Sequence, residues 1–180
     1  MRQQSWHIAL CALLAALGTV LMAVGGLIPI ATYTTPLFAA LLLLPVLQEF
    51  GPRWAGMVWL VTALLALMVS ADREAAALYW VLGWYPILKP RVDALGPLAL
   101  PAKAALFTLA QCVEYALLIW VFQLQQVLQE WGTYTQAITV LMIASLTAVL
   151  LIWDALLGRM RRFYIHRIRP KLPRMWEQRR

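Results

Sequence analysis

The sequence predicts an all-α polytopic membrane protein, a compact bundle of about six transmembrane helices with both termini in the cytoplasm. Two observations carry this prediction. First, 63% of the 180 residues are hydrophobic and 13% are charged, whereas soluble domains have about 45–50% apolar and about 25% charged residues. Second, the basic residues divide unevenly between alternate loops, as they do in multi-pass proteins. A soluble core of this size could not bury so much apolar surface.

The first 70 residues are expected to form three helices. After Arg2 the next charged residue is Glu49, and this interval is long enough for two passes. The proline-containing stretch 28–36 breaks it, which predicts helices at about 6–28 and 36–48. A charged Gly-Pro turn at 49–53 then precedes a third helix at about 54–70.

The second half is expected to form three more helices. A polar turn at 72–74 leads into a short helix at about 75–88. Residues 89–101 contain three charged residues, three prolines and one glycine, a composition typical of a loop. Helices at about 102–127 and 136–158 follow. The helices at 36–48 and 75–88 are the shortest, and either could be partly re-entrant.

The charge pattern predicts the orientation and two regions, a transmembrane bundle at 1–158 and a basic cytoplasmic tail at 159–180. Fourteen of the 15 basic residues fall at the N-terminus, in or beside alternate loops, or in the tail, and the other side holds only Arg73. Because basic loops stay inside, the sequence predicts a multi-pass protein of the cell membrane with both ends cytoplasmic. The tail is expected to lie on anionic membrane lipid, and no motif indicates nucleic-acid binding.

Motifs for catalysis and cofactors are missing from the sequence. It contains no glycine-rich phosphate loop, no His-Glu-x-x-His and no paired cysteine motif. We therefore expect no enzyme activity, no cofactor and no metal site. Cys11 and Cys112 fall within predicted spans and are expected to be reduced and buried.

Glu114 is the main candidate for a functional residue, because it is the only acidic residue near the centre of a predicted span. A charge there costs roughly 2.5–3.5 kcal/mol. Gln111 lies one turn before it and Tyr115 beside it. Glu114 either contacts a substrate or cation, or it is a protonated or hydrogen-bonded carboxyl that ties helices together. Both interpretations require the side chain to face the bundle interior.

Aromatic and polar residues extend this candidate binding site toward the outer side. Tyr79 and Trp80 lie toward the outer half of their helix, and Tyr33 and Thr34 lie in the loop before helix 36–48. Aromatic side chains line ligand pockets, but they also mark membrane interfaces. Asp154 is expected near the cytoplasmic end, in a structural ion pair with Arg53, Lys103 or Arg159.

Small residues line one face of the first predicted helix. They recur at spacings of three and four and are Ala9, Ala12, Ala16, Thr19, Ala23 and Gly26. Small residues let helices approach closely in lipid. The face therefore serves either internal packing or docking of another membrane protein.

The segments Ala12-Leu13-Leu14-Ala15-Ala16-Leu17-Gly18, Ile28-Pro29-Ile30 and Thr35-Pro36-Leu37, together with the predicted architecture, resemble the S components of energy-coupling factor (ECF) vitamin transporters. The resemblance implies a substrate-binding subunit for uptake of a vitamin-like small molecule. It also implies that the first helix docks on a transmembrane coupling subunit powered by ATPases, and that the loop after it caps a ligand pocket. Two features depart from the family pattern, the short loop at 29–35 and the long basic tail. The alternative is a non-transporting membrane scaffold or assembly protein, similar to the cell-shape protein MreD.

Overall fold

The computed structural model describes residues 2–28, 31–120 and 136–169, and these ranges are helical without a β-strand. In chain order the elements are α1 (Arg2–Gly25), α2 (Thr34–Leu41), α3 (Leu43–Glu49), α4 (Pro52–Val69), α5 (Arg73–Leu82), α6 (Tyr85–Asp93), the 3₁₀ turn η2 (Gly96–Leu98), α7 (Ala99–Trp120), α9 (Gln136–Phe163) and the π-helical turn η3 (Tyr164–Ile168).

Within the residues that the structure describes, four helical stretches are long and apolar enough to cross a membrane. They are His7–Gly25, Pro52–Val69, Gly96–Trp120 and Val140–Arg167, and a shorter apolar stretch covers Thr34–Glu49. Large hydrophobic side chains on these helices are exposed, among them Leu13, Met68, Leu109 and Ile152. Exposed apolar surface of this kind is what lipid-facing helices present. The fold class is therefore all-helical and compatible with a membrane protein.

The two short predicted helices are each divided in two. The first is interrupted at Leu42, between α2 and α3, and the second at Gly83 and Trp84, between α5 and α6. At Gly83 an added Cβ would collide with the carbonyl oxygen of Tyr79. The close approach therefore requires glycine at this position.

The prediction of a loop at 89–101 is wrong, because α6 continues to Asp93 with Pro90 inside it, and α7 already begins at Ala99. Pro86 and Pro101 each lie in the first turn of a helix, where the missing N–H has no intrahelical acceptor to lose. The Lys89–Asp93 ion pair, 3.4 Å long, spans one turn of α6. The predicted end of helix 102–127 lies outside the described residues.

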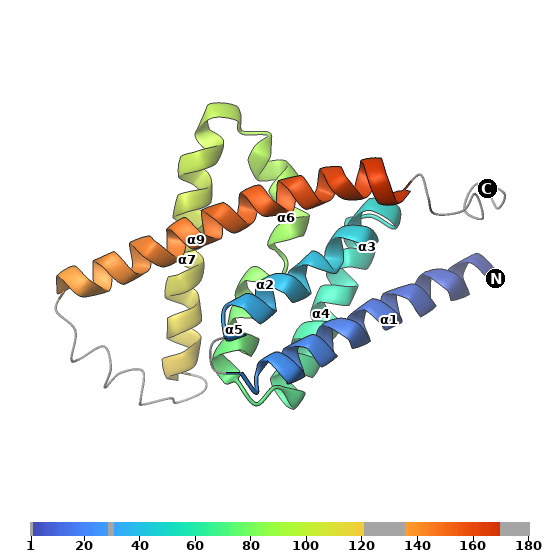
Figure 1. The fold of residues 1–180 in the computed structure, drawn as a ribbon, viewed down its shortest axis with the longest axis horizontal. Coiled ribbons are helices and arrows are strands. Elements are labelled where there is room, and N and C mark those ends of the chain that lie inside the picture. The colour runs from blue at the N-terminus through green and yellow to red at the C-terminus, as the bar shows by residue number, and fades with distance from the viewer. Residues whose placement is uncertain (1, 29–30, 121–135, 170–180) are drawn as a thin grey trace.

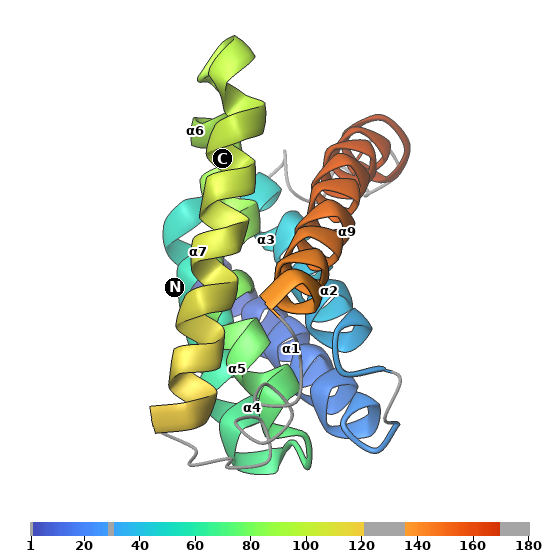
Figure 2. The same cartoon turned by 90° about the vertical axis from the view of Figure 1, so that its left-hand side faces the viewer.

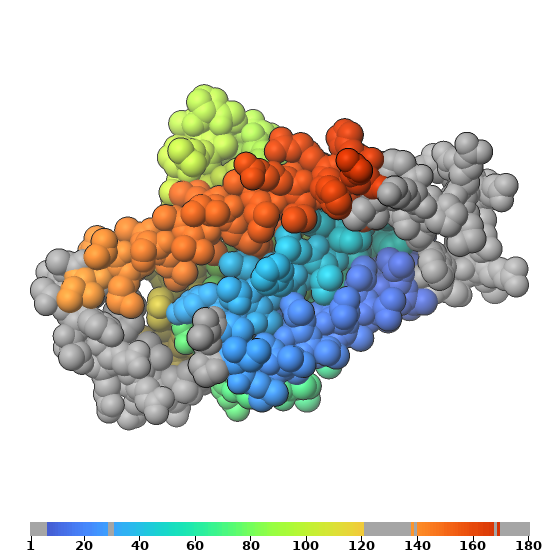
Figure 3. Space-filling view, viewed as in Figure 1, coloured from blue at the N-terminus to red at the C-terminus, as the bar shows by residue number. Residues whose placement is uncertain are grey.

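The helices form one bundle in which α1, the α2–α3 pair and α9 run as three successive bands across one face (Figures 1 and 3). α1 packs mainly on α4, and α7 packs on both α5 and α9. Figure 2 shows α7 at the side of the bundle, with α9 next to it. α9 continues past residue 158 into the predicted tail.

Side-chain contacts define two ends of the bundle. At the Thr32 end (residues 22–28, 31–35 and 70–74), Thr32 donates a hydrogen bond to Asp72 at 2.6 Å, and Ser70 donates one to the Met22 carbonyl at 3.3 Å. At the Glu49 end (residues 7, 49–54 and 164–169), His7 packs on Phe50, with ring centroids 4.4 Å apart. Tyr164 and Arg169 both contact Glu49 there. The beginning of α1, the end of α3 and the end of α9 therefore meet at the same end (Figure 1).

Small residues allow α1 to approach α2 and α4 closely. An added Cβ at Gly25 would collide with the Thr35 side chain, and one at Gly18 would lie 3.0 Å from Thr62. The main hydrophobic core beside this contact includes Met22, Leu78, Tyr79, Phe107, Leu150 and Leu157. Cys11 is buried as predicted, but Cys112 is exposed, which suits a lipid-facing position because a thiol is only weakly polar.

Candidate functional site

One face of α7 carries polar side chains into the bundle. Its buried residues are Lys103, Phe107, Gln111, Glu114 and Leu118. The spacings of three and four place all five on one face of the helix. Gln111 and Glu114 are each 1% exposed. The predicted inward orientation of Glu114 is therefore confirmed.

Gln111 and Glu114 each present an oxygen atom that lacks a hydrogen bond. The amide nitrogen of Gln111 donates to the Thr147 hydroxyl on α9 at 3.0 Å. Within the described part of the chain, however, Gln111 Oε1 and Glu114 Oε2 are buried without a hydrogen-bond partner. A buried polar atom without a partner costs about 1–3 kcal/mol. Two such acceptors, one turn apart on the same helix face, can receive hydrogen bonds from a ligand.

Two residues from the Thr32 end, Tyr33 and Glu74, adjoin α7 near this face. Tyr33 donates a hydrogen bond to Glu74 Oε1 at 2.5 Å and also interacts with Tyr115. Glu74 lies in the first turn of α5, and α5 packs on α7. Burial, together with the bond to Glu74, raises the pKa of Tyr33, so its hydroxyl remains a donor. We call Tyr33, Glu74, Gln111, Glu114 and Tyr115 the acceptor cluster.

The other predicted ligand residues have structural contacts. Thr34 is exposed and its hydroxyl donates to the Ala31 carbonyl at 3.2 Å. Tyr79 lies in the hydrophobic core at 1% exposure. Trp80 is half-buried and packs on Trp59, with ring centroids 5.6 Å apart.

Glu74 was not singled out by sequence reasoning, because it follows Asp72 and Arg73 in what reads as a solvated turn. Asp72 caps α5 by accepting hydrogen bonds from the backbone N–H groups of Glu74 and Ala75. This cap places Glu74 in the first turn of α5. An Asp followed by a Glu before an apolar run is a helix-start signal that could have located it.

The seam of small residues on α1 lies beside its buried face. The residues that α1 buries include Cys11, Ala15 and Met22. In the seam, Ala9, Ala12 and Ala16 are exposed, whereas Thr19, Ala23 and Gly26 are half-buried. Internal packing by the described residues therefore accounts for the second half of the seam and leaves the first half uncovered.

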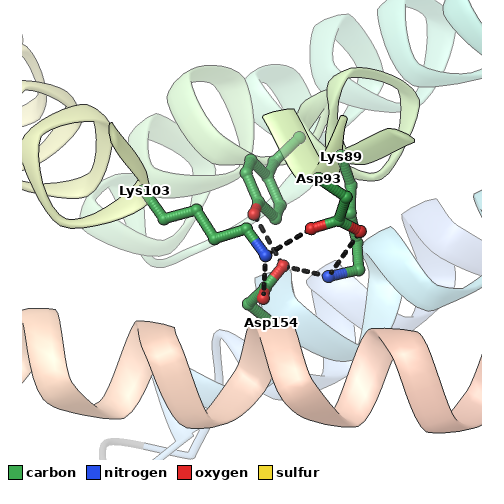
Figure 4. A network of polar contacts seen from close by, with 5 residues as sticks. Lys89, Asp93, Lys103 and Asp154 are labelled. Atoms are coloured by element: carbon green, nitrogen blue, oxygen red, sulfur yellow. Dashed lines mark hydrogen bonds and ion pairs between the residues drawn. The ribbon is translucent and has the colours of Figure 1, made fainter. Parts of the chain in front are cut away.

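A second buried polar group, the lysine–aspartate cluster, joins α6, α7 and α9 (Figure 4). It consists of Tyr85, Lys89, Asp93, Lys103 and Asp154. Of the three ion-pair partners considered for Asp154 in the sequence, the structure selects Lys103 and adds Lys89. Lys89 was not considered as a partner of Asp154 because it falls in the expected loop, although its spacing of four from Asp93 is a usable signal.

Asp154 is the centre of this cluster. Its Oδ1 accepts hydrogen bonds from Lys89 and, at 2.6 Å, from the Tyr85 hydroxyl, while Oδ2 accepts one from Lys103 at 2.7 Å. Asp93 pairs with both lysines. Lys89, Lys103 and Asp154 are at most 9% exposed. Two positive and two negative charges balance, so the cluster is electrically neutral. Its charged side chains pair with one another and join the three helices, whereas the acceptor cluster contains unpartnered oxygens.

Comparisons with known proteins add no relative: no model of a protein family matches the chain, and no curated protein or solved structure shows significant similarity to it.

Proposed function

We propose that this protein is the membrane-embedded, substrate-binding subunit of an uptake system for a small molecule, similar to an ECF S component, with energy supplied by partner ATPases. The observation that carries the proposal is the pair of buried, unpartnered oxygens on Gln111 and Glu114. Maintaining such atoms in an apolar bundle destabilises the protein. The cost is explained if a ligand supplies the missing hydrogen bonds.

The proposed topology has six passes and cytoplasmic termini. At 1.5 Å per residue, Thr34–Glu49 extends roughly 24 Å and Arg73–Asp93 roughly 30 Å, compared with a hydrocarbon core of about 30 Å. The broken helices are thus long enough, with local thinning, to join the four longer spans. The meeting of α1, α3 and α9 at the Glu49 end supports an even number of passes.

Reporter fusions test this topology. A reporter after Gln48, Pro90 or Arg180 should be cytoplasmic, and one after Tyr33, Arg73 or Glu130 should be external, because the basic segments stay inside. A reporter after Arg180 that is found outside would contradict six passes.

The uncovered half of the seam supports docking of a partner. Ala9, Ala12 and Ala16 are exposed on α1, and small side chains permit close helix contact in a membrane. In the proposed complex this face meets the transmembrane coupling subunit. The same exposure also favours the second candidate function, a non-transporting scaffold or assembly protein of the MreD kind, so the seam does not discriminate between them.

Ligand content discriminates between the two functions. The protein is purified in mild detergent, and small molecules that accompany it are identified by mass spectrometry. An uptake subunit should yield a stoichiometric ligand from the native chain and a reduced amount from Glu114→Gln, which keeps size but loses charge. If neither chain yields a ligand, the scaffold function is favoured.

A further inference from the structure

The end of α9 presents a row of exposed basic side chains. Arg159, Arg162 and His166 are exposed, and their spacings of three and four place them on one side of the helix. The Nδ1 atom of His166 lies 2.9 Å from the carbonyl oxygen of Arg162, so the row continues from α9 into the turn η3. We call these three residues the basic face. Figure 3 shows this end of α9 at the surface of the bundle.

The opposite side of the same segment is fixed to the bundle. Leu157 and Tyr164 are buried. The Tyr164 hydroxyl donates a hydrogen bond to Glu49 at 3.4 Å, and Arg169 pairs with Glu49 at 3.5 Å. Within the ranges that the structure describes, neither Arg159 nor Arg162 pairs with a carboxylate. These contacts hold the segment in place and leave the basic face directed outward.

The outward side of α9 is apolar before it becomes basic. Ile152 is 70% exposed and Phe163 is 56% exposed, and both lie beside the basic face. The candidate span Val140–Arg167 has 28 residues, which extend roughly 42 Å at 1.5 Å per residue. The hydrocarbon core of a bilayer is about 30 Å thick and needs about 20 residues. Counted from the start of the span, the core therefore ends near Arg159, and the basic face lies at the level of the lipid headgroups.

The charge at this end of the bundle is unbalanced. Residues 49–54 and 159–169 contain six arginines and one acidic residue, Glu49, which already contacts Tyr164 and Arg169. In the proposed topology this end lies in the cytoplasmic leaflet, where anionic lipids give the membrane a negative surface potential. Anionic headgroups therefore complement the charge of this surface. A zwitterionic headgroup does so less well, because it carries a positive charge of its own.

From this geometry we infer that the basic face is a binding site for an anionic phospholipid. The lipid phosphate lies between Arg159 and Arg162, next to His166, and an acyl chain lies along Ile152 and Phe163. Guanidinium groups suit this role because their planar arrangement of donors matches two phosphate oxygens at once. The site does not depend on the proposed uptake function, since it requires only that α9 crosses the membrane.

Native mass spectrometry of the purified full-length protein measures lipid binding. Phosphatidylglycerol, which is anionic, and phosphatidylcholine, which is zwitterionic, are added to the detergent solution with identical acyl chains. We expect phosphatidylglycerol to bind more tightly. One basic residue at the membrane surface contributes about fivefold in affinity for anionic lipid. The double variant Arg159→Gln with Arg162→Gln should therefore weaken phosphatidylglycerol binding about 25-fold and phosphatidylcholine binding much less.

Two variants serve as controls. Arg73→Gln makes the same change of charge at the opposite end of the bundle, where Arg73 is exposed between Asp72 and Glu74 in the chain. It should leave phosphatidylglycerol binding unchanged. Arg159→Lys with Arg162→Lys keeps both charges but loses the planar guanidinium groups. This variant should retain most of the preference for phosphatidylglycerol, which shows that charge at these two positions selects the lipid.

The outcomes separate this site from weaker explanations. If the double glutamine variant keeps the native preference for phosphatidylglycerol, or if the native protein has no such preference, the inference is overturned. It is also overturned if Arg73→Gln weakens binding equally, because the preference then reflects net charge alone. If soluble glycerol phosphate displaces the lipid at equal concentration, the surface binds free phosphate and is not a lipid site. Ligand content, which tests the uptake function, is measured separately and is unaffected by these results.

Discussion

Replacing Asp154 by asparagine is the sharpest perturbation of the lysine–aspartate cluster. The substitution preserves the size of the side chain but removes its negative charge. Asp93 would then be the only anion left in the cluster to balance Lys89 and Lys103. Asp93 is also the most exposed member, with 41% of its side chain accessible. The variant therefore leaves one uncompensated positive charge in a buried site.

The expected loss follows from this burial. Breaking a buried ion pair by removing one partner costs about 3–5 kcal/mol, and Asp154 has three donors to lose, namely Tyr85, Lys89 and Lys103. We expect Asp154→Asn to reduce the free energy of unfolding by about 3 kcal/mol or more. Combining it with Lys103→Gln restores neutrality. The double variant should therefore lose less than the sum of the two single variants, with a coupling of about 1–3 kcal/mol.

Reversible urea unfolding in mixed micelles, followed by circular dichroism, measures these losses. The matched control is Arg169→Gln. It removes an ion pair with Glu49 that is 3.5 Å long and whose arginine side chain is 58% exposed, so it should cost about 0–1 kcal/mol. If Asp154→Asn costs no more than this control, or if the double variant is fully additive, the cluster is not a desolvated clamp and the reasoning fails.

Three further predictions concern glycine packing, the α1 seam and Glu114, and all use the same unfolding assay. Gly25→Ala should cost about 1–3 kcal/mol because its Cβ would collide with a neighbouring side chain. Gly56→Ala, where nothing lies within 4 Å of the new Cβ, should be neutral or stabilising; equal losses would contradict the close α1–α2 packing. Ala12→Trp should leave the stability of the isolated protein within about 0.5 kcal/mol, whereas the buried Ala15→Trp should lose about 1–3 kcal/mol; a loss at Ala12 would show that the seam packs internally. Glu114→Leu should leave the free energy of unfolding unchanged or raise it, because it removes a buried unpartnered oxygen; a clear loss would mean that the carboxyl holds helices together.

The sequence predicted the apolar helices and the inward face of α7, because both depend on local properties. Charged residues bound the apolar runs, and the cost of a carboxylate in hydrocarbon determines which way Glu114 points. The faces of the other helices were harder to predict. On α1 the residues that face outward include Leu13, Leu17 and Val20, while the smaller Cys11 and Ala15 are buried. Since both faces of a lipid-exposed helix are apolar, hydrophobic periodicity does not separate them.

The lysine–aspartate cluster could not be predicted in full, because its contacts join residues far apart in the chain. Lys89 and Asp154 are separated by 65 positions, and Lys103 and Asp154 by 51. Composition favoured a loop at 89–101, since three prolines usually end helices. In the structure Pro101 lies in the first turn of α7, and Pro97 lies in η2, directly before that helix. Burial of Lys89 against α9 holds α6 in place. Tertiary contacts thus override local propensity there.

The position of Asp154 in the chain has a consequence for biosynthesis. Lys89, Asp93 and Lys103 are synthesised before Asp154, and together they carry one excess positive charge. Until α9 leaves the ribosome, no other member of the cluster can neutralise that charge. The hairpin of α6 and α7 should therefore stay near the lipid headgroups, where water solvates the lysines, and settle only when α9 arrives. Assembly of this part of the bundle is then completed by α9 rather than pair by pair.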